Sequence, residues 1–158
     1  MKTETLVKLC ILAILAIQIS CNKETNAPVI QQPPVTLGDM LACHRLTSWD
    51  SLSIHNKLIG KWEWEYIRCH WNPEDGNYKD FQGMLVQFKP DNTLVVTVNG
   101  QTTQTSIWKI VSLNDNNFII NVTPIVLQLP GRIYFCSERV LFSDSYTDGC
   151  DNYFKKKD

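Results

Sequence analysis

After Gly60, the chain consists of short alternating segments separated by turn residues, and no other sequence feature constrains the fold as strongly. The segment 62–66 alternates strictly between aromatic and acidic residues, which is typical of a strand with one buried and one solvated face. Similar segments recur at intervals of about 8–12 residues. They are residues 83–89, 93–99, 102–111, 118–122, 125–136, 139–143 and 150–155. Eight short antiparallel strands of this kind predict an all-β barrel or sandwich.

The residues between these segments support the same interpretation. Asn99-Gly100 is the strongest hairpin signal, and Pro130-Gly131 interrupts the segment 125–136, where we expect a bulge or kink. Residues 39–46 and 50–59 are the two helix candidates, and Asp50 is placed to cap the second.

Length and charge limit the range of functions. A chain of 158 residues allows one domain of ordinary size. Its 44% hydrophobic and 20% charged residues indicate a globular protein. The net charge is −1, whereas nucleic-acid-binding proteins typically carry an excess of basic residues. We therefore expect no nucleic-acid partner.

The first residues predict export and lipid anchoring. Lys2 and Lys8 accompany the apolar run 9–17, which is too short to cross a bilayer as a helix but suits a signal peptide. The run ends at Gln18-Ile-Ser-Cys21, where a small residue directly precedes a cysteine, and this ending resembles bacterial lipoprotein signals. The resemblance implies removal of residues 1–20 and lipidation of Cys21.

The residues after the signal predict a tether and a location. Residues 21–37 contain three prolines and no aromatic residue. Because proline restricts φ and lacks an N–H donor, we expect a flexible, semi-extended tether. In lipoproteins of double-membrane bacteria, Asp after the lipidated cysteine accompanies inner-membrane retention. By this resemblance, Asn22 implies anchoring in the outer membrane of the cell envelope.

The start of the first strand carries the most specific pattern. Gly60-Lys-Trp62, directly after a helical segment, resembles the Gly-x-Trp signature of lipocalins and lipocalin-like barrels. The wider pattern is similar to that of lipocalin-like lipoproteins of Bacteroidota. It is carried by residues 60–64, 88–94, 106–109 and 148–154. The resemblance implies an eight-stranded, antiparallel, up-and-down barrel over residues 58–158, preceded by a short helical segment.

The same resemblance assigns roles at the closed end of the barrel, which we call the floor. It implies that Gly60 allows a sharp turn there and that Trp62 fills the floor. It also implies that a basic side chain near the end of the last strand, Lys155 or Lys156, packs on this Trp. We expect residues 38–57 to cross the floor before the first strand begins.

Four cysteines remain outside the signal and the lipid anchor, and export permits them to form disulfides. In the implied topology, Cys69 ends the first strand and Cys150 starts the last, both at the open end, or mouth. Cys136 lies at the floor, which the segment carrying Cys43 must pass. We therefore predict the pairs Cys69–Cys150 and Cys43–Cys136.

Patterns for metal binding and catalysis are weak. Two Cys-His pairs, at 43–44 and 69–70, offer zinc ligands without the spacing of a zinc finger. The acidic segment 144–151 lacks the ligand order of an EF-hand. Glu63 and Glu65 are expected on the solvated outer face. Because the sequence also lacks the familiar nucleophile and phosphate-binding motifs, we expect no enzyme, metal or cofactor.

The favoured function is a membrane-anchored, lipocalin-like lipoprotein that binds a small hydrophobic ligand. An eight-stranded barrel holds either packed side chains or one small ligand. Alternation in the first strand predicts Trp64 and Tyr66 on one face, where aromatic residues of three other strands converge with them. The predicted ligand-binding residues are Trp64, Tyr66, Phe88, Trp108 and Phe118. The Tyr66 hydroxyl and Arg68 are candidates for orienting a polar head group.

The alternative function is an interaction module. In that case the barrel is solid, and the loop 70–82 contacts another protein of the envelope. The loop carries Trp71, Tyr78 and Phe81, and exposed aromatic residues are common in protein interfaces. The sequence identifies no protein partner, and we expect a monomer in both cases.

Replacing the predicted lipid acceptor tests the anchor. We expect Cys21→Ala to abolish lipoprotein processing and to release the protein from the membrane fraction, whereas Cys10→Ala, within the signal, leaves both unchanged. Envelope fractionation and metabolic labelling with a palmitate analogue measure the two effects. Wild-type membrane association of Cys21→Ala would place the anchor elsewhere.

Overall fold

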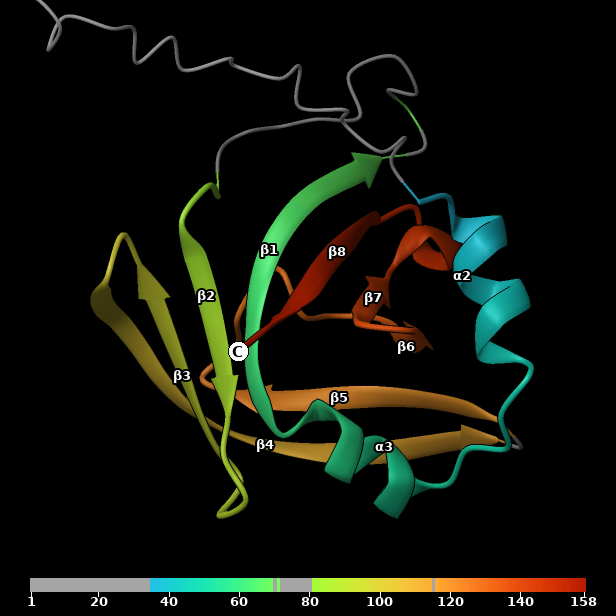
Figure 1. The fold of residues 1–158 in the computed structure, drawn as a ribbon, viewed down its shortest axis with the longest axis horizontal. Coiled ribbons are helices and arrows are strands. Elements are labelled where there is room, and N and C mark those ends of the chain that lie inside the picture. Colours follow the sequence, from blue (N-terminus) through green and yellow to red (C-terminus); the bar gives the residue numbers. More distant parts are fainter. Residues whose placement is uncertain (1–34, 70, 72–80, 115) are drawn as a thin grey trace, which may run out of the picture. The chain divides into compact units, whose positions relative to one another are not determined.

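Eight antiparallel strands close into a barrel in the computed structural model, which describes residues 35–69, 71, 81–114 and 116–158 (Figure 1). Each strand pairs with its neighbours in the sequence, and the first pairs with the last. The strands are β1 (Gly60–Cys69), β2 (Met84–Phe88), β3 (Thr93–Val98), β4 (Gln101–Asn114), β5 (Asn117–Thr123), β6 (Arg132–Cys136), β7 (Arg139–Ser143) and β8 (Cys150–Lys157). The predicted up-and-down barrel is confirmed, and residues 35–158 form one compact unit.

Both predicted helices are present, and each begins with a capping box. Thr36 caps α2 (Leu37–His44), and Asp50 caps α3 (Ser51–Leu58). In each cap, the side chain of the residue before the helix accepts a backbone N–H inside it, which satisfies a donor that the helix leaves unpaired. The predicted role of Asp50 is thereby confirmed.

The two helices cover different parts of the barrel. α3 lies across the floor (Figure 1), where Ile54 and Leu58 are fully buried in the main core. α2 instead lies along the outer wall against β6, and its Met40 packs among outward-facing side chains that include Tyr153. Of residues 38–57, which were expected to cross the floor, α3 therefore does so and α2 does not.

Trp62 fills the floor, as the resemblance implied. Its side chain is fully buried, and its indole N–H donates to the carbonyl of Leu58 at 2.6 Å. The ammonium of Lys156 lies 4.3 Å from the Trp62 ring centroid and donates to the carbonyl of Ile59 at 2.7 Å. A cation over an indole face is attracted by the ring quadrupole. Desolvation by burial lowers the pKa of Lys156.

The geometry of the floor requires glycine at position 60, and it shows which of the two candidate lysines packs on Trp62. Gly60 has a φ of +124°, and a Cβ there would lie 2.9 Å from Nζ of Lys156. Glycine therefore fits both the backbone conformation and the space. Lys155 is exposed on the outer wall, so Lys156 makes the contact with Trp62.

Both predicted disulfides are confirmed. Cys69 and Cys150 are register partners in the β1–β8 ladder, so their bond links the first and last strands at the mouth. Cys43 of α2 bonds to Cys136 at the end of β6, which fixes the helix to the outer wall near the floor. Such bonds stabilise a fold mainly by restricting the unfolded chain.

The expectation that Tyr66 shares a face with Trp64 is wrong. The register between β1 and β8 shifts between these two residues, which leaves Glu65 as the extra residue of a β-bulge. A bulge rotates the residues that follow it, so Tyr66 points outward beneath α2. Its ring stacks on Tyr153 with centroids 4.3 Å apart, and its hydroxyl donates to the carbonyl of Val35 at 2.6 Å.

The predicted strand 125–136 is correct only for its last part. β6 spans Arg132–Cys136, and residues 124–131 form turns instead. The two prolines in this stretch have no N–H to donate to a ladder. Val126 and Leu129 insert into the core with exposed fractions of 4% and 1%. Val126 and Leu129 therefore add to the barrel core from a turn rather than from a strand.

Truncating the floor residue tests the packing of the barrel. We expect Trp62→Ala to lower the free energy of unfolding by about 3–5 kcal/mol, because it removes a buried aromatic side chain and leaves a cavity. Trp71→Ala is the matched control, since this indole is 63% exposed, and its cost should stay below about 0.5 kcal/mol. Urea unfolding with both disulfides intact measures the difference. Similar costs for the two variants would contradict a floor plugged by Trp62.

Candidate functional site

Four of the five predicted ligand-binding aromatic residues meet inside the barrel, where they are packed. Trp64, Phe88, Trp108 and Phe118 belong to the main core, with exposed fractions of 1–5%. Phe88 and Trp108 contact edge to face at 5.1 Å. None of the four lines either of the two cavities described below.

The predicted head-group pair lies elsewhere. Tyr66 faces the outer wall, and the guanidinium of Arg68 lies 5.8 Å from its ring centroid. Burial raises the pKa of Tyr66 to about 12, so the phenol stays protonated as a donor. The two side chains that were expected to orient a ligand therefore support the helix α2 and do not face the interior.

The structure shows what the residues of the weak metal and acid–base patterns do instead. Cys43 and Cys69 are in disulfides, and His70 lies outside the described residues. Within the described ranges, no three His, Cys, Asp or Glu side chains gather into a metal site. The carboxylate of Glu63 pairs with Lys157, and that of Glu65 pairs with Arg139 at 2.8 Å. The two glutamates therefore lie on the outer face of the barrel, as predicted, and form ion pairs there.

Most of the loop 70–82 lies outside the described residues, including Tyr78. Trp71 is 63% exposed. Phe81 is half-buried and contacts Trp64 edge to face at 5.4 Å. The end of the loop is therefore connected to the barrel core through one aromatic pair.

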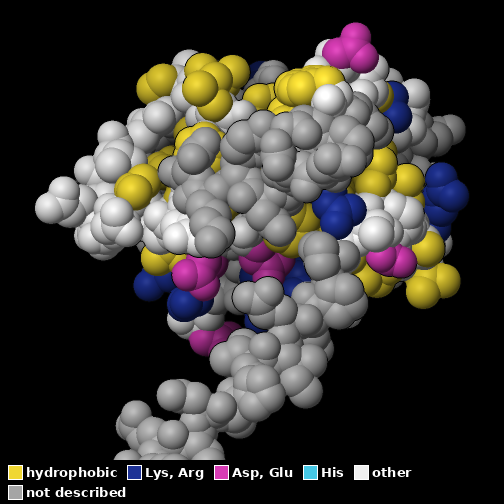
Figure 2. Space-filling view, turned by 90° about the horizontal axis from the view of Figure 1, so that it is seen from above, with side chains coloured by type: hydrophobic (Ala, Val, Ile, Leu, Met, Phe, Trp, Pro, Cys, Tyr) yellow, Lys and Arg dark blue, Asp and Glu magenta, His cyan; other side chains and the backbone are white. Residues whose placement is uncertain are grey.

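A first cavity, the mouth cavity, lies at the open end of the barrel and has a volume of about 240 Å³. Its lining combines apolar side chains with a few polar ones. The lining residues are Ile67, Phe81, Leu127, Gln128, Pro130, Asp144, Cys150 and Asn152. Figure 2, which looks onto this end, shows hydrophobic side chains gathered in several groups on it. Ile125 and Leu127 are 63% and 74% exposed there.

A second cavity, the seam cavity, has a volume of about 510 Å³ and lies where β5 and β6 separate. These strands pair at one register position only within the described chain, Ile119 with Arg132. The cavity is bordered by the end of α2, the connection between α2 and α3, the turn before β5, and β6. The lining residues are Leu41, His44, Arg45, Thr47, Ser48, Trp49, Asn116, Asn117, Arg132 and Tyr134.

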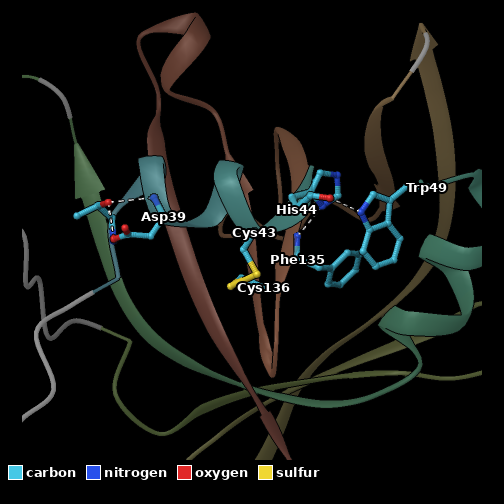
Figure 3. The surroundings of a disulfide bond; sticks show 7 residues. Asp39, Cys43, His44, Trp49, Phe135 and Cys136 are labelled. Atoms are coloured by element: carbon cyan, nitrogen blue, oxygen red, sulfur yellow. Dashed lines mark hydrogen bonds between the residues drawn. A yellow bond between two sulfur atoms is a disulfide. The ribbon is translucent and has the colours of Figure 1, made fainter. Parts of the chain in front are cut away.

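His44 organises the wall of the seam cavity (Figure 3). Its Nδ1 accepts the backbone N–H of Phe135 at 3.0 Å, which satisfies a β6 donor that β5 does not reach. The imidazole stacks on Trp49 with centroids 5.1 Å apart, and the Trp49 indole N–H donates to the carbonyl of His44 at 2.9 Å. The sequence marked His44 only as half of a Cys-His pair, and no sequence signal pointed to this cavity.

Burial sets the protonation of His44. The residue is 4% exposed, and desolvation lowers its pKa to about 4. Because Nδ1 accepts a hydrogen bond, the neutral ring carries its proton on Nε2. That nitrogen has no hydrogen-bond partner among the described residues. His44 is thus a neutral donor in the wall of the seam cavity.

No protein-family model, curated protein or solved structure matches this chain. In the part of the chain that the structure describes, no helix has the length and apolarity needed to cross a membrane.

The depressed pKa of His44 predicts a pH dependence of stability. In the unfolded chain this histidine has its ordinary pKa of 6.5, and burial lowers the pKa to about 4 in the folded protein. The contribution of His44 to stability is therefore fully present above about pH 6.5 and falls as the pH drops toward 4, by about 3 kcal/mol. Asp39, Asp50 and Asp91 have pKa values lowered from 3.8 by hydrogen bonds, so their contribution is lost only at lower pH.

Two measurements check this prediction. NMR titration should show the His44 ring titrating near pH 4, and chemical unfolding of His44→Gln should show a weaker decline in stability between pH 6.5 and 4.5 than the wild type. Titration of His44 near pH 6.5 in the folded protein would contradict its burial.

Proposed function

We propose that the protein is a lipid-anchored, lipocalin-like protein of the cell envelope that binds a small apolar ligand at the mouth of its barrel. The signal-like N-terminus with Cys21 supports the anchor. The contact of Trp62 with Lys156 supports the likeness to lipocalins, because that likeness implies a basic side chain packed on this Trp. Asn22 supports the outer membrane as the location.

The observation that carries the binding proposal is the position of the mouth cavity relative to the packed core. Phe81 lines the cavity and contacts Trp64, the core aromatic residue beneath it. Ligand sites of drug-sized molecules occupy about 300–1,000 Å³, and the mouth cavity has about 240 Å³. A ligand of few atoms, or one end of a longer chain, therefore suits it better than a bulky lipid.

Polar groups beside the apolar wall offer a way to orient the ligand. The side-chain oxygen of Asn152 accepts the indole N–H of Trp64 at 3.1 Å. Its amide NH₂ then remains as a donor at the edge of the mouth cavity. In the proposal, Asn152 takes the role that the sequence suggested for Tyr66 and Arg68.

A second candidate function is the interaction module. It is favoured by the exposure of large apolar side chains at the same end of the barrel, at Trp71, Ile125 and Leu127. Exposed apolar groups that lie together mark contact surfaces. The ligand titration described next distinguishes the two functions, because only the first requires saturable binding of a small molecule.

Titration with a fluorescent fatty-acid probe tests the ligand site. A soluble form of residues 22–158 retains Val35, whose carbonyl accepts the Tyr66 hydroxyl. We expect saturable binding that changes Trp64 emission, because Trp64 contacts the cavity residue Phe81. We also expect Leu127→Asp to weaken binding at least about tenfold, since it places a charge in the apolar wall.

Leu113→Asp is the matched control, because Leu113 is also exposed, at 49%, but is absent from the lining of the mouth cavity. This variant should bind the probe like the wild type. Equal weakening by both variants, or no binding at tens of micromolar probe with the disulfides intact, would refute the ligand site and favour the interaction module.

A further inference from the structure

We propose that the seam cavity is a second binding site, specific for a small organic acid in which a carboxylate is attached to a planar apolar group. The site is separate from the mouth cavity, because the two cavities have no lining residue in common. The proposal therefore does not depend on the function proposed for the mouth.

The cavity exists because the barrel ladder is incomplete at this seam. β5 and β6 pair at Ile119 and Arg132, and the backbone N–H of Phe135 further along β6 donates to His44 of α2 instead of to β5. Trp49 from this connection contacts Phe135 of β6 at 5.1 Å between ring centroids. The disulfide from Cys43 to Cys136 holds the end of α2 beside the same strand. The walls of the cavity are thus fixed by covalent and aromatic contacts.

The charge of the lining favours an anion. Arg45 and Arg132 contribute two guanidinium groups, and none of the described lining residues is acidic. Neither arginine forms an ion pair with any described residue. The guanidinium of Arg132 lies 4.2 Å from the Tyr146 ring centroid, and its Nε has no hydrogen-bond partner within the described chain. Arginine binds carboxylates through paired N–H donors.

Neutral donors complete the polar side of the cavity. The proton on Nε2 of His44 lacks an acceptor among the described residues. A buried donor without an acceptor is costly, so a ligand oxygen that reaches it gains more than it would at an exposed donor. The amide of Asn116 lies on the opposite, β5 side of the same cavity, whereas that of Asn117, also in the lining, donates to the side-chain oxygen of Asn114 at 2.6 Å.

The remaining walls explain why an inorganic anion is not the best fit. Trp49, Tyr134 and Leu41 contribute aromatic and aliphatic surface to the lining. The volume of about 510 Å³ far exceeds that of phosphate or sulfate and lies within the usual range of small-molecule sites. Aromatic side chains bind planar apolar groups by stacking and edge contacts. In a ligand with a carboxylate on a flat ring system, the carboxylate would therefore bind the polar side of the cavity and the ring would pack on the apolar side.

The test compares 2-naphthoate with 2-naphthamide, which has the same shape without the charge. With the soluble form of residues 22–158, isothermal titration should show naphthoate binding at least about tenfold more tightly than the amide, as expected for charge-assisted hydrogen bonds. NMR should show that naphthoate shifts the His44 imidazole and Trp49 indole signals.

Arg132→Gln should weaken naphthoate binding at least about tenfold and leave amide binding unchanged, and Arg132→Lys should restore part of the loss. Arg68→Gln is the matched control, because Arg68 lies on the outer wall beside Tyr66. Two-dimensional NMR spectra verify that each variant is folded, so a loss of binding is attributable to the site.

Four results would overturn the proposal. They are equal binding of naphthoate and naphthamide, wild-type binding by Arg132→Gln, competition by inorganic phosphate at the same concentration as naphthoate, and the absence of shifts at His44 and Trp49. Loss of fatty-acid binding in Leu127→Asp would affect only the mouth cavity, so the failure of one site is distinguishable from the failure of the other.

Discussion

The pairing of β1 with β8 holds the barrel closed, and both its floor and its mouth are built on this ladder. It places Trp62 opposite Lys156, and this pair, with α3 beneath it, closes the floor. It also brings Cys69 opposite Cys150 at the mouth. Without this pairing, β1 and β8 would be free edges with unpaired backbone groups. One ladder therefore determines the floor, the closure of the sheet and one of the two disulfides.

A barrel of eight strands has a narrow interior, and aromatic residues fill it here. Phe88 contacts both Trp108 and Phe142 in the core, and Val126 and Leu129 complete the core from the segment before β6. The cavities that we assign to binding lie where this packing or pairing ends, at the mouth and at the β5–β6 seam. The packed interior stabilises the fold, and we propose that ligands bind at the edges of the barrel.

The features that follow from local alternation and from the order of the strands were predicted from the sequence. It predicted the inward position of Trp64, and it predicted both disulfides, because strand order places the cysteines at the two ends of the barrel. It failed at Tyr66, because the bulge at Glu65 reverses the alternation and Tyr66 packs with Met40 of α2 on the outer wall. It could not reveal the seam cavity, since that cavity depends on how far β5 and β6 pair, which no periodicity encodes.

We propose that side chains fill the interior and that apolar ligands bind at the mouth. Photo-crosslinking with a short diazirine-bearing fatty acid, followed by peptide mass spectrometry, tests it most directly. We expect cross-links at mouth residues such as Phe81, Leu127 and Pro130. Cross-links at the core residues Phe88 or Trp108, or the absence of any saturable cross-link, would contradict it.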